Sequence, residues 1–185
     1  MDIKETLLAD YSKTTMLKVV TWVGQDIDRF HQLTEQVFSP IYRVAQRSSW
    51  AMIFCVENHP DLLLPYLPKF IEVLQNPNTG ETVKRNIVRT ITVIDIPEEH
   101  CGTLYDLCFG FFKSLQEAIA VRVFSMTVMA NIALRYPDLI PEVEMMIHQN
   151  MPPDAPASIA ARGKHELKRL NKFQSVKTMP RSGKQ

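Results

Sequence analysis

The sequence predicts an all-α protein, a right-handed α–α superhelix of about four stacked helix pairs with one further helix capping its C-terminal end. Three observations predict this fold class. Apolar residues recur at spacings of three and four along much of the chain, glycine is scarce at 6 of 185 residues, and one short pattern returns at a nearly fixed interval. The spacing is typical of amphipathic helices, and the recurrence is typical of stacked helical repeats.

The recurring pattern is a short stretch of small and branched residues that ends in arginine. It reads VAQR, TVKR, IAVR and IAAR, and its arginines are 38, 37 and 40 residues apart. Apolar residues follow each of the first three at helical spacing, so each stretch opens the first helix of a pair. We call these four arginines the arginine column; they are Arg47, Arg85, Arg122 and Arg162.

Prolines mark where the second helix of each pair begins. Pro60, Pro97 and Pro137 are 37 and 40 residues apart, and an acidic residue follows each of them. Proline suits the first turn of a helix, and a carboxylate there complements the positive helix end. We therefore expect second helices at 61–74, 98–112 and 138–148.

The expected units form a single domain over residues 1–172. They cover about 14–39, 40–76, 80–114 and 117–150, with a capping helix at 156–172. The first unit lacks the arginine, and the residues before it are expected to fray. Beyond 172 the chain is basic and without periodicity, so 173–185 is expected to be a disordered tail.

The segments HPDLLLPYLPKFIEVL and YPDLIPEVEMMI resemble the HEAT-repeat family, within the armadillo-like α-solenoids. The resemblance covers about residues 40–172. It implies a non-enzymatic scaffold that binds a protein or peptide on the concave face of the stack, without bond chemistry. The polar residues of the second helices are the expected contacts: Lys69, Glu72, Asp106, Lys113, Glu142 and His148.

The alternative function is binding of nucleic acid or another anion by the arginine column and the basic C-terminal end. Residues 162–185 contain eight Lys or Arg and one acid, whereas the remainder contains 13 basic and 19 acidic residues. A competing interpretation makes the column a structural ladder, in which each arginine pairs with an acid or with helix-end carbonyls of a neighbouring unit. Besides the column, the candidate binding residues are Lys84, Arg89, Lys164, Lys168 and Arg169.

Other classes of function find little support. The three cysteines form no CxxC pair, the five histidines are scattered, and no nucleophile elbow, phosphate loop or dinucleotide motif is present. We therefore expect no catalytic residue, no metal and no cofactor, although an enzyme with a cleft built on repeats stays an open third hypothesis. An acidic start without an apolar run, and reduced thiols, indicate a cytoplasmic protein with no membrane partner.

Overall fold

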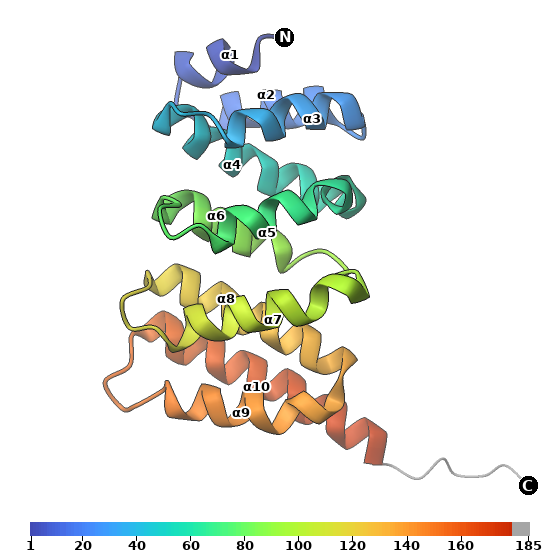
Figure 1. The fold of residues 1–185 in the computed structure, drawn as a ribbon, viewed down its shortest axis with the longest axis vertical. Helices are drawn as coiled ribbons and strands as arrows, with labels where there is room; N and C mark the ends of the chain where they lie inside the picture. The colour runs from blue at the N-terminus through green and yellow to red at the C-terminus, as the bar shows by residue number, and fades with distance from the viewer. Residues whose placement is uncertain (179–185) are drawn as a thin grey trace, which may run out of the picture. The chain divides into compact units, whose positions relative to one another are not determined.

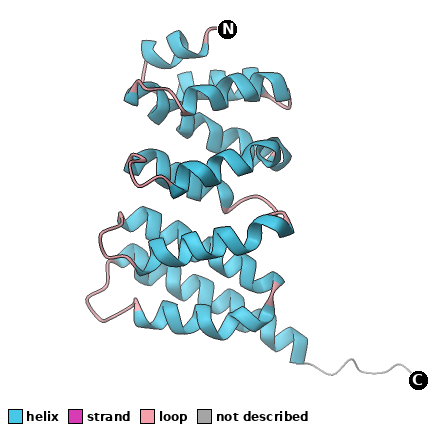
Figure 2. Ribbon diagram, viewed as in Figure 1, coloured by secondary structure: helices cyan, strands magenta, loops and turns pink. Residues whose placement is uncertain are grey.

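The computed structural model describes the backbone of residues 1–178 and the side chains of residues 1–176. These residues form ten α-helices and two 3₁₀ helices and contain no strand, so the predicted all-α class is confirmed (Figure 2). The chain divides into two compact units, residues 1–100 and 101–185. Each is described by itself.

Unit 1 consists of three first helices and the shorter elements that follow them. α4 packs against α2, α3 and α6, and α1 packs on α2, α3 and α4 (Figure 1). Phe30, Leu33, Ile53 and Phe70 are buried at its core. The elements are α1 Ile3–Ala9, α2 Lys13–Val23, α3 Ile27–Val37, α4 Tyr42–Asn58, η1 Pro60–Tyr66, α5 Leu67–Gln75 and α6 Glu81–Ile91.

Unit 2 contains the remaining helices. α10 packs against α8 and α9, and α8 packs against α9. In Figure 1, α7 lies in front of α8 and α9 in front of α10. Phe112, Met126, Ile147 and Leu170 are buried. The elements are α7 Glu98–Lys113, which begins at the end of unit 1, α8 Ile119–Arg135, η2 Pro137–Leu139, α9 Ile140–Gln149 and α10 Ala157–Thr178.

The N-terminal segment differs from the prediction, because residues 3–9 form the helix α1 instead of a fraying start. Ile3 and Leu7 lie four residues apart on one face and are 5% and 2% exposed. The Asp2 side chain caps the helix by accepting from the amide of Glu5. A capped, amphipathic turn with two buried side chains is enough to hold this segment against α4.

The second helices begin less regularly than predicted. α7 begins at Glu98 as expected, but α5 and α9 are preceded by 3₁₀ turns at Pro60–Tyr66 and Pro137–Leu139. Pro65 lies inside the first of these turns. A proline has no amide to donate and disfavours the α conformation of the residue before it, which explains why an α-helix does not start at Asp61.

The C-terminal helix is longer than predicted. α10 continues to Thr178, six residues beyond the expected end of the cap at Lys172. Phe173 is partly buried, so the apolar contact of the helix extends past Leu170. Residues 173–178 of the expected disordered tail are therefore helical, and residues 179–185 lie outside the described residues.

Candidate functional site

Arg47, the first arginine of the column, ties α4 to α1. Its Nη1 donates to the carbonyl oxygen of Leu7 in the last turn of α1, and its guanidinium lies 4.9 Å from the ring centroid of Tyr11. The last carbonyls of a helix have no partner within it and carry a partial negative charge. Arg47 therefore satisfies a helix end, as one form of the ladder interpretation expects.

Arg122 makes the corresponding contact in unit 2 and is almost fully buried, at 6% exposed. Its Nε donates to the carbonyl oxygen of Phe112 in the last turn of α7, at 3.1 Å. Its Nη2 donates to Oδ1 of Asn150, the C-cap residue of α9, at 3.2 Å. One side chain of α8 thus holds the C-terminal ends of both second helices of this unit.

Arg85, the column residue of α6, contacts only its own helix in the hydrogen bond that it donates. Arg85 donates from Nε to Oδ1 of the adjacent Asn86 at 3.3 Å, and Lys84 is partly buried beside it. Asn86 itself is buried and donates to Oγ of Ser49 on α4 at 2.8 Å.

Arg89 forms an ion pair with Glu57 of α4 at 3.0 Å. The sequence suggested acids as partners of the column arginines. Glu57, however, pairs with Arg89, which lies one turn after the column residue Arg85 on α6. Because both side chains are about one-third exposed, the pair adds little stability.

Arg162 and Arg169 flank a buried carboxylate. Glu166 of α10 is 0% exposed and accepts from Oγ1 of Thr127 on α8 at 2.8 Å. Arg162 lies 3.5 Å from one carboxylate oxygen, and Arg169 donates to the other. Arg162 also donates to Thr127, and Arg169 to Asn131, so the cluster joins α10 to α8. Sequence reasoning missed Glu166, although it stands three or four residues from each arginine.

Lys164 and Lys168 differ from the arginines, because both are exposed on the outer side of α10. The nine candidate binding residues therefore fall into three groups. Six arginines contact neighbouring residues of the fold, and the two lysines of α10 point to solvent, with Lys84 between these extremes.

The exposed residues of the second helices form what we call the second-helix surface, present separately in each unit. All six contacts that the sequence predicted there are exposed: Lys69, Glu72, Asp106, Lys113, Glu142 and His148.

Charge is divided between the two sets of helices. The second helices α3, α5, α7 and α9, with η1 and η2, contain 10 Asp or Glu and 3 Lys or Arg. The first helices α2, α4, α6, α8 and α10 contain 3 Asp or Glu and 15 Lys or Arg. The second-helix surface is thus acidic in a chain whose net charge is only +1.

In unit 1 an aromatic side chain lies among these acids. Tyr66 is partly buried, and its ring centroid lies 5.6 Å from that of Phe30 and 5.7 Å from that of His31. Burial raises the pKa of Tyr66, and the nearby carboxylates of Asp28 and Glu35 raise it further. Neither carboxylate forms an ion pair among the described residues, so this part of the surface is electronegative.

In unit 2 the surface combines acids with apolar side chains. Tyr105 of α7 donates to Glu142 of α9 at 2.9 Å, and burial followed by this contact raises the pKa of Tyr105. Met145 is 51% exposed one turn beyond Glu142, and Phe109 of α7 is partly buried. Tyr105 thereby fixes two neighbouring second helices to each other.

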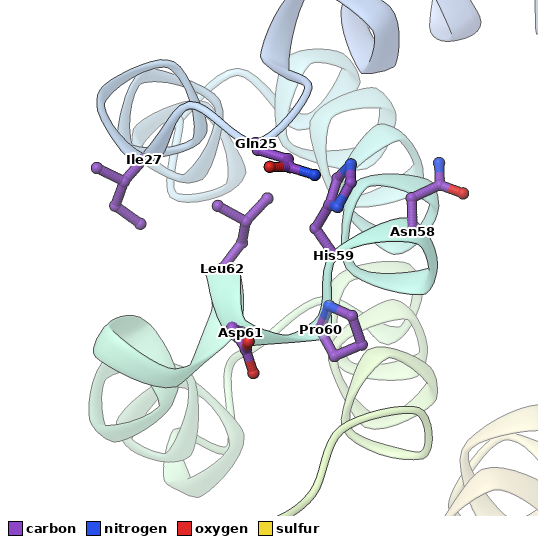
Figure 3. A pocket seen from close by; sticks show the side chains of 7 residues that line it. All are labelled: Gln25, Ile27, Asn58, His59, Pro60, Asp61 and Leu62. Carbon is purple, nitrogen blue, oxygen red and sulfur yellow. The ribbon is translucent and has the colours of Figure 1, made fainter.

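A pocket of about 480 Å³ lies in unit 1, where the α2–α3 loop meets the end of α4 and the start of η1 (Figure 3). Gln25 and His59 extend toward each other, whereas Asn58 points away. Asp61 and Leu62 complete one wall. The pocket lining includes hydrogen-bonding side chains. Within residues 1–176, no three His, Cys, Asp or Glu side chains lie together as the ligands of a metal ion would.

The buried thiols Cys55 and Cys108 are expected to resist alkylation. Burial raises the pKa of each to about 12, so about one thiol in ten thousand is ionised at pH 8. In native protein treated with iodoacetamide, both thiols should stay unmodified. In protein unfolded in guanidinium, both should be alkylated, and mass spectrometry measures the difference. Rapid modification of Cys108 in the native protein would contradict this prediction.

Helix pairs stacked in this way within each unit, with polar side chains joining successive pairs, define a helical repeat protein. The sequence matches the model of the HEAT repeat domain family over residues 3–170, and the chain belongs to that family. The match includes α1, which the sequence analysis had left outside the repeats. A search of curated proteins and a search of solved structures each found no match. Within residues 1–178, none of the helices has both the length and the apolar character that a bilayer crossing requires.

Proposed function

We propose that this chain is a protein-binding scaffold whose second-helix surfaces contact the partner. HEAT repeats generally mediate protein interactions. The observation that carries the proposal is the division of charge, with 10 acidic and 3 basic residues in the second helices against 3 and 15 in the first helices. A segment of positive charge is the partner that complements such a surface, and charge complementarity sets both encounter rate and specificity.

The proposed surface also contains the apolar groups that a protein interface needs. Binding energy concentrates in a few aromatic and apolar anchors surrounded by polar residues. Tyr66, which packs on the buried Phe30, supplies such a group beside Asp28 in unit 1, and Met145 and Phe109 supply them in unit 2.

The contacts of the arginine column favour the structural interpretation over the anion-binding one. Arg47 and Arg122 donate to helix-end carbonyls, and Arg162 lies beside the buried Glu166. A guanidinium that already donates in this way would have to leave its acceptor unsatisfied before it could bind a phosphate, and a buried unsatisfied acceptor costs about 1–3 kcal/mol.

Charge reversal on the second-helix surface should weaken binding of the partner. Tagged full-length chain would be incubated with nuclease-treated lysate of the native host, and a captured protein would be identified, purified and titrated. We expect the double variant Asp28→Lys/Glu35→Lys, and separately Asp106→Lys, to weaken its binding at least tenfold, because each places positive charge against a positive partner.

The matched control for the double variant is Glu5→Lys/Asp154→Lys, which makes the same charge change at exposed positions outside the second helices. It should bind within twofold of the unmodified chain. The proposal is wrong if all three variants bind the captured protein alike, or if no protein is retained once nuclease has acted.

A further inference from the structure

The outer side of α10 carries a row of lysines. Lys164, Lys168 and Lys172 are all exposed and follow one another at intervals of four residues. Four residues of α-helix advance about 6 Å along the axis, so the three side chains leave the same side of the helix one turn apart. We call these three residues the lysine row.

The acid that could neutralise the row is turned away from it. Glu166, the one carboxylate of α10, is 0% exposed and is occupied by Arg162, Arg169 and Thr127. None of the three lysines forms an ion pair among the described residues. The row therefore presents three uncompensated positive charges to solvent.

Holding these charges together costs helix stability. Like charges four residues apart destabilise a helix, and the row contains two such pairs. An acid at any exposed position of this face would have relieved the repulsion. An anionic partner that spans the row would reverse the sign of this effect, because each lysine would then gain a counter-charge.

The remaining exposed residues of this face indicate which anion fits. From Ala157 to Val176 they are alanine, serine, histidine and asparagine, with Val176 at the C-terminal end as the one large apolar side chain among them. A protein interface needs an apolar core, and a helix that lies in a membrane surface needs an apolar face. Interfaces with nucleic acid are by contrast polar and strongly positive.

The spacing of the row also suits a phosphodiester backbone. Phosphates on one strand of a duplex advance about 3.4 Å each, so lysines about 6 Å apart lie close to the interval of every second phosphate. Lysine is a point charge without the fork that reads a guanine edge, and phosphate contacts position a protein without carrying sequence information.

We propose that the lysine row of α10 binds the phosphate backbone of nucleic acid without reading its sequence. This surface is separate from the second-helix surface of the proposed function, and the two proposals can fail independently.

The test is fluorescence anisotropy of the full chain with a labelled 20-base-pair duplex of mixed sequence, over a range of salt concentrations. The unmodified chain should bind in the range typical of non-specific contacts, about 10⁻⁴ to 10⁻⁶ M at physiological salt. Lys164→Gln/Lys168→Gln/Lys172→Gln should lose at least tenfold in affinity. Its slope of log affinity against log salt should be shallower by about 2.7, because three phosphate contacts are removed.

The matched control is Lys4→Gln/Lys13→Gln/Lys18→Gln, which removes the same charge from exposed lysines of unit 1. It should bind within twofold of the unmodified chain. A duplex of a second sequence should bind equally. Equal loss in both triple variants, unchanged binding in the row variant, or tighter binding to polyglutamate or to anionic phospholipid vesicles than to the duplex would overturn the proposal.

Discussion

Replacing Arg122 with methionine is expected to lower the free energy of unfolding by about 3 kcal/mol. The substitution keeps most of the apolar stem but removes two charged donors. The carbonyl oxygen of Phe112 and the side-chain oxygen of Asn150 then lose the donors that Arg122 supplied. Because Arg122 is only 6% exposed, water has little access to replace these donors. Chemical denaturation followed by circular dichroism measures the loss.

The control for Arg122 is Arg43→Met, since Arg43 is an exposed arginine of α4 and surface changes of this kind stay within about 0.5 kcal/mol. Arg122→Lys should recover less than half of the loss, because an ammonium on a flexible stem cannot reproduce the two directed contacts. A stability of Arg122→Met equal to that of the control would contradict the structural interpretation of the column.

Removing the carboxylate of Glu166 should cost a similar amount. Glu166→Ala leaves Arg162 and Arg169 without their shared counter-charge, removes the acceptor of Thr127, and opens space between α10 and α8. Breaking a fully buried pair costs about 3–5 kcal/mol. Because each arginine is about one-third exposed and can turn toward water, we expect about 2–3 kcal/mol, again by chemical denaturation.

Glu166→Gln separates charge from shape at the same position. It keeps the volume and an acceptor for Thr127, so it should lose about half as much as the alanine variant. Asp154→Ala, in an exposed loop, serves as the surface control. If Glu166→Ala unfolds at the same denaturant concentration as Asp154→Ala, the cluster does not hold α10 in place.

The helix pairs were predictable because their signals are local. Arginines and prolines at a fixed interval give the order of the helices directly, and α7 begins at Glu98 as its proline indicates. The helix α1 was missed because it has neither mark. Its signals were nevertheless present, in Asp2 as a cap and in Ile3 and Leu7 four residues apart.

The partners of the arginines were not predictable from the sequence, since they depend on which helix ends meet. Arg47 donates to the carbonyl oxygen of Leu7, forty residues earlier in the chain. Arg122 donates to Phe112, which precedes it, and to Asn150, which follows it. Glu166 is a charged residue in a basic segment, so it would ordinarily be expected at the surface. Only its place in the pattern Ile159, Gly163, Glu166 and Leu170 shows that it faces the same side as buried residues.

The helix bounds also explain why the acidic character of the second helices was hard to recognise from the sequence. Charge totals taken along the chain show a mildly acidic body and a basic end. The division appears only when residues are assigned to alternate helices, and that assignment needs the helix bounds. The six polar residues named from the family resemblance lie exposed on second helices, and whether they contact a partner stays a prediction. The aromatic Tyr66, near Asp28 and Glu35, was not predicted.

The most direct test of the scaffold proposal is carbodiimide labelling of carboxylates in the chain with and without its captured partner, read by mass spectrometry. We expect the partner to protect Asp28, Glu35 and Asp106 on the second helices, while Glu5 and Asp154 label as fully as in the free chain. Protection of Glu57 and Glu81 on the first helices, with unchanged labelling of the second helices, would contradict the account.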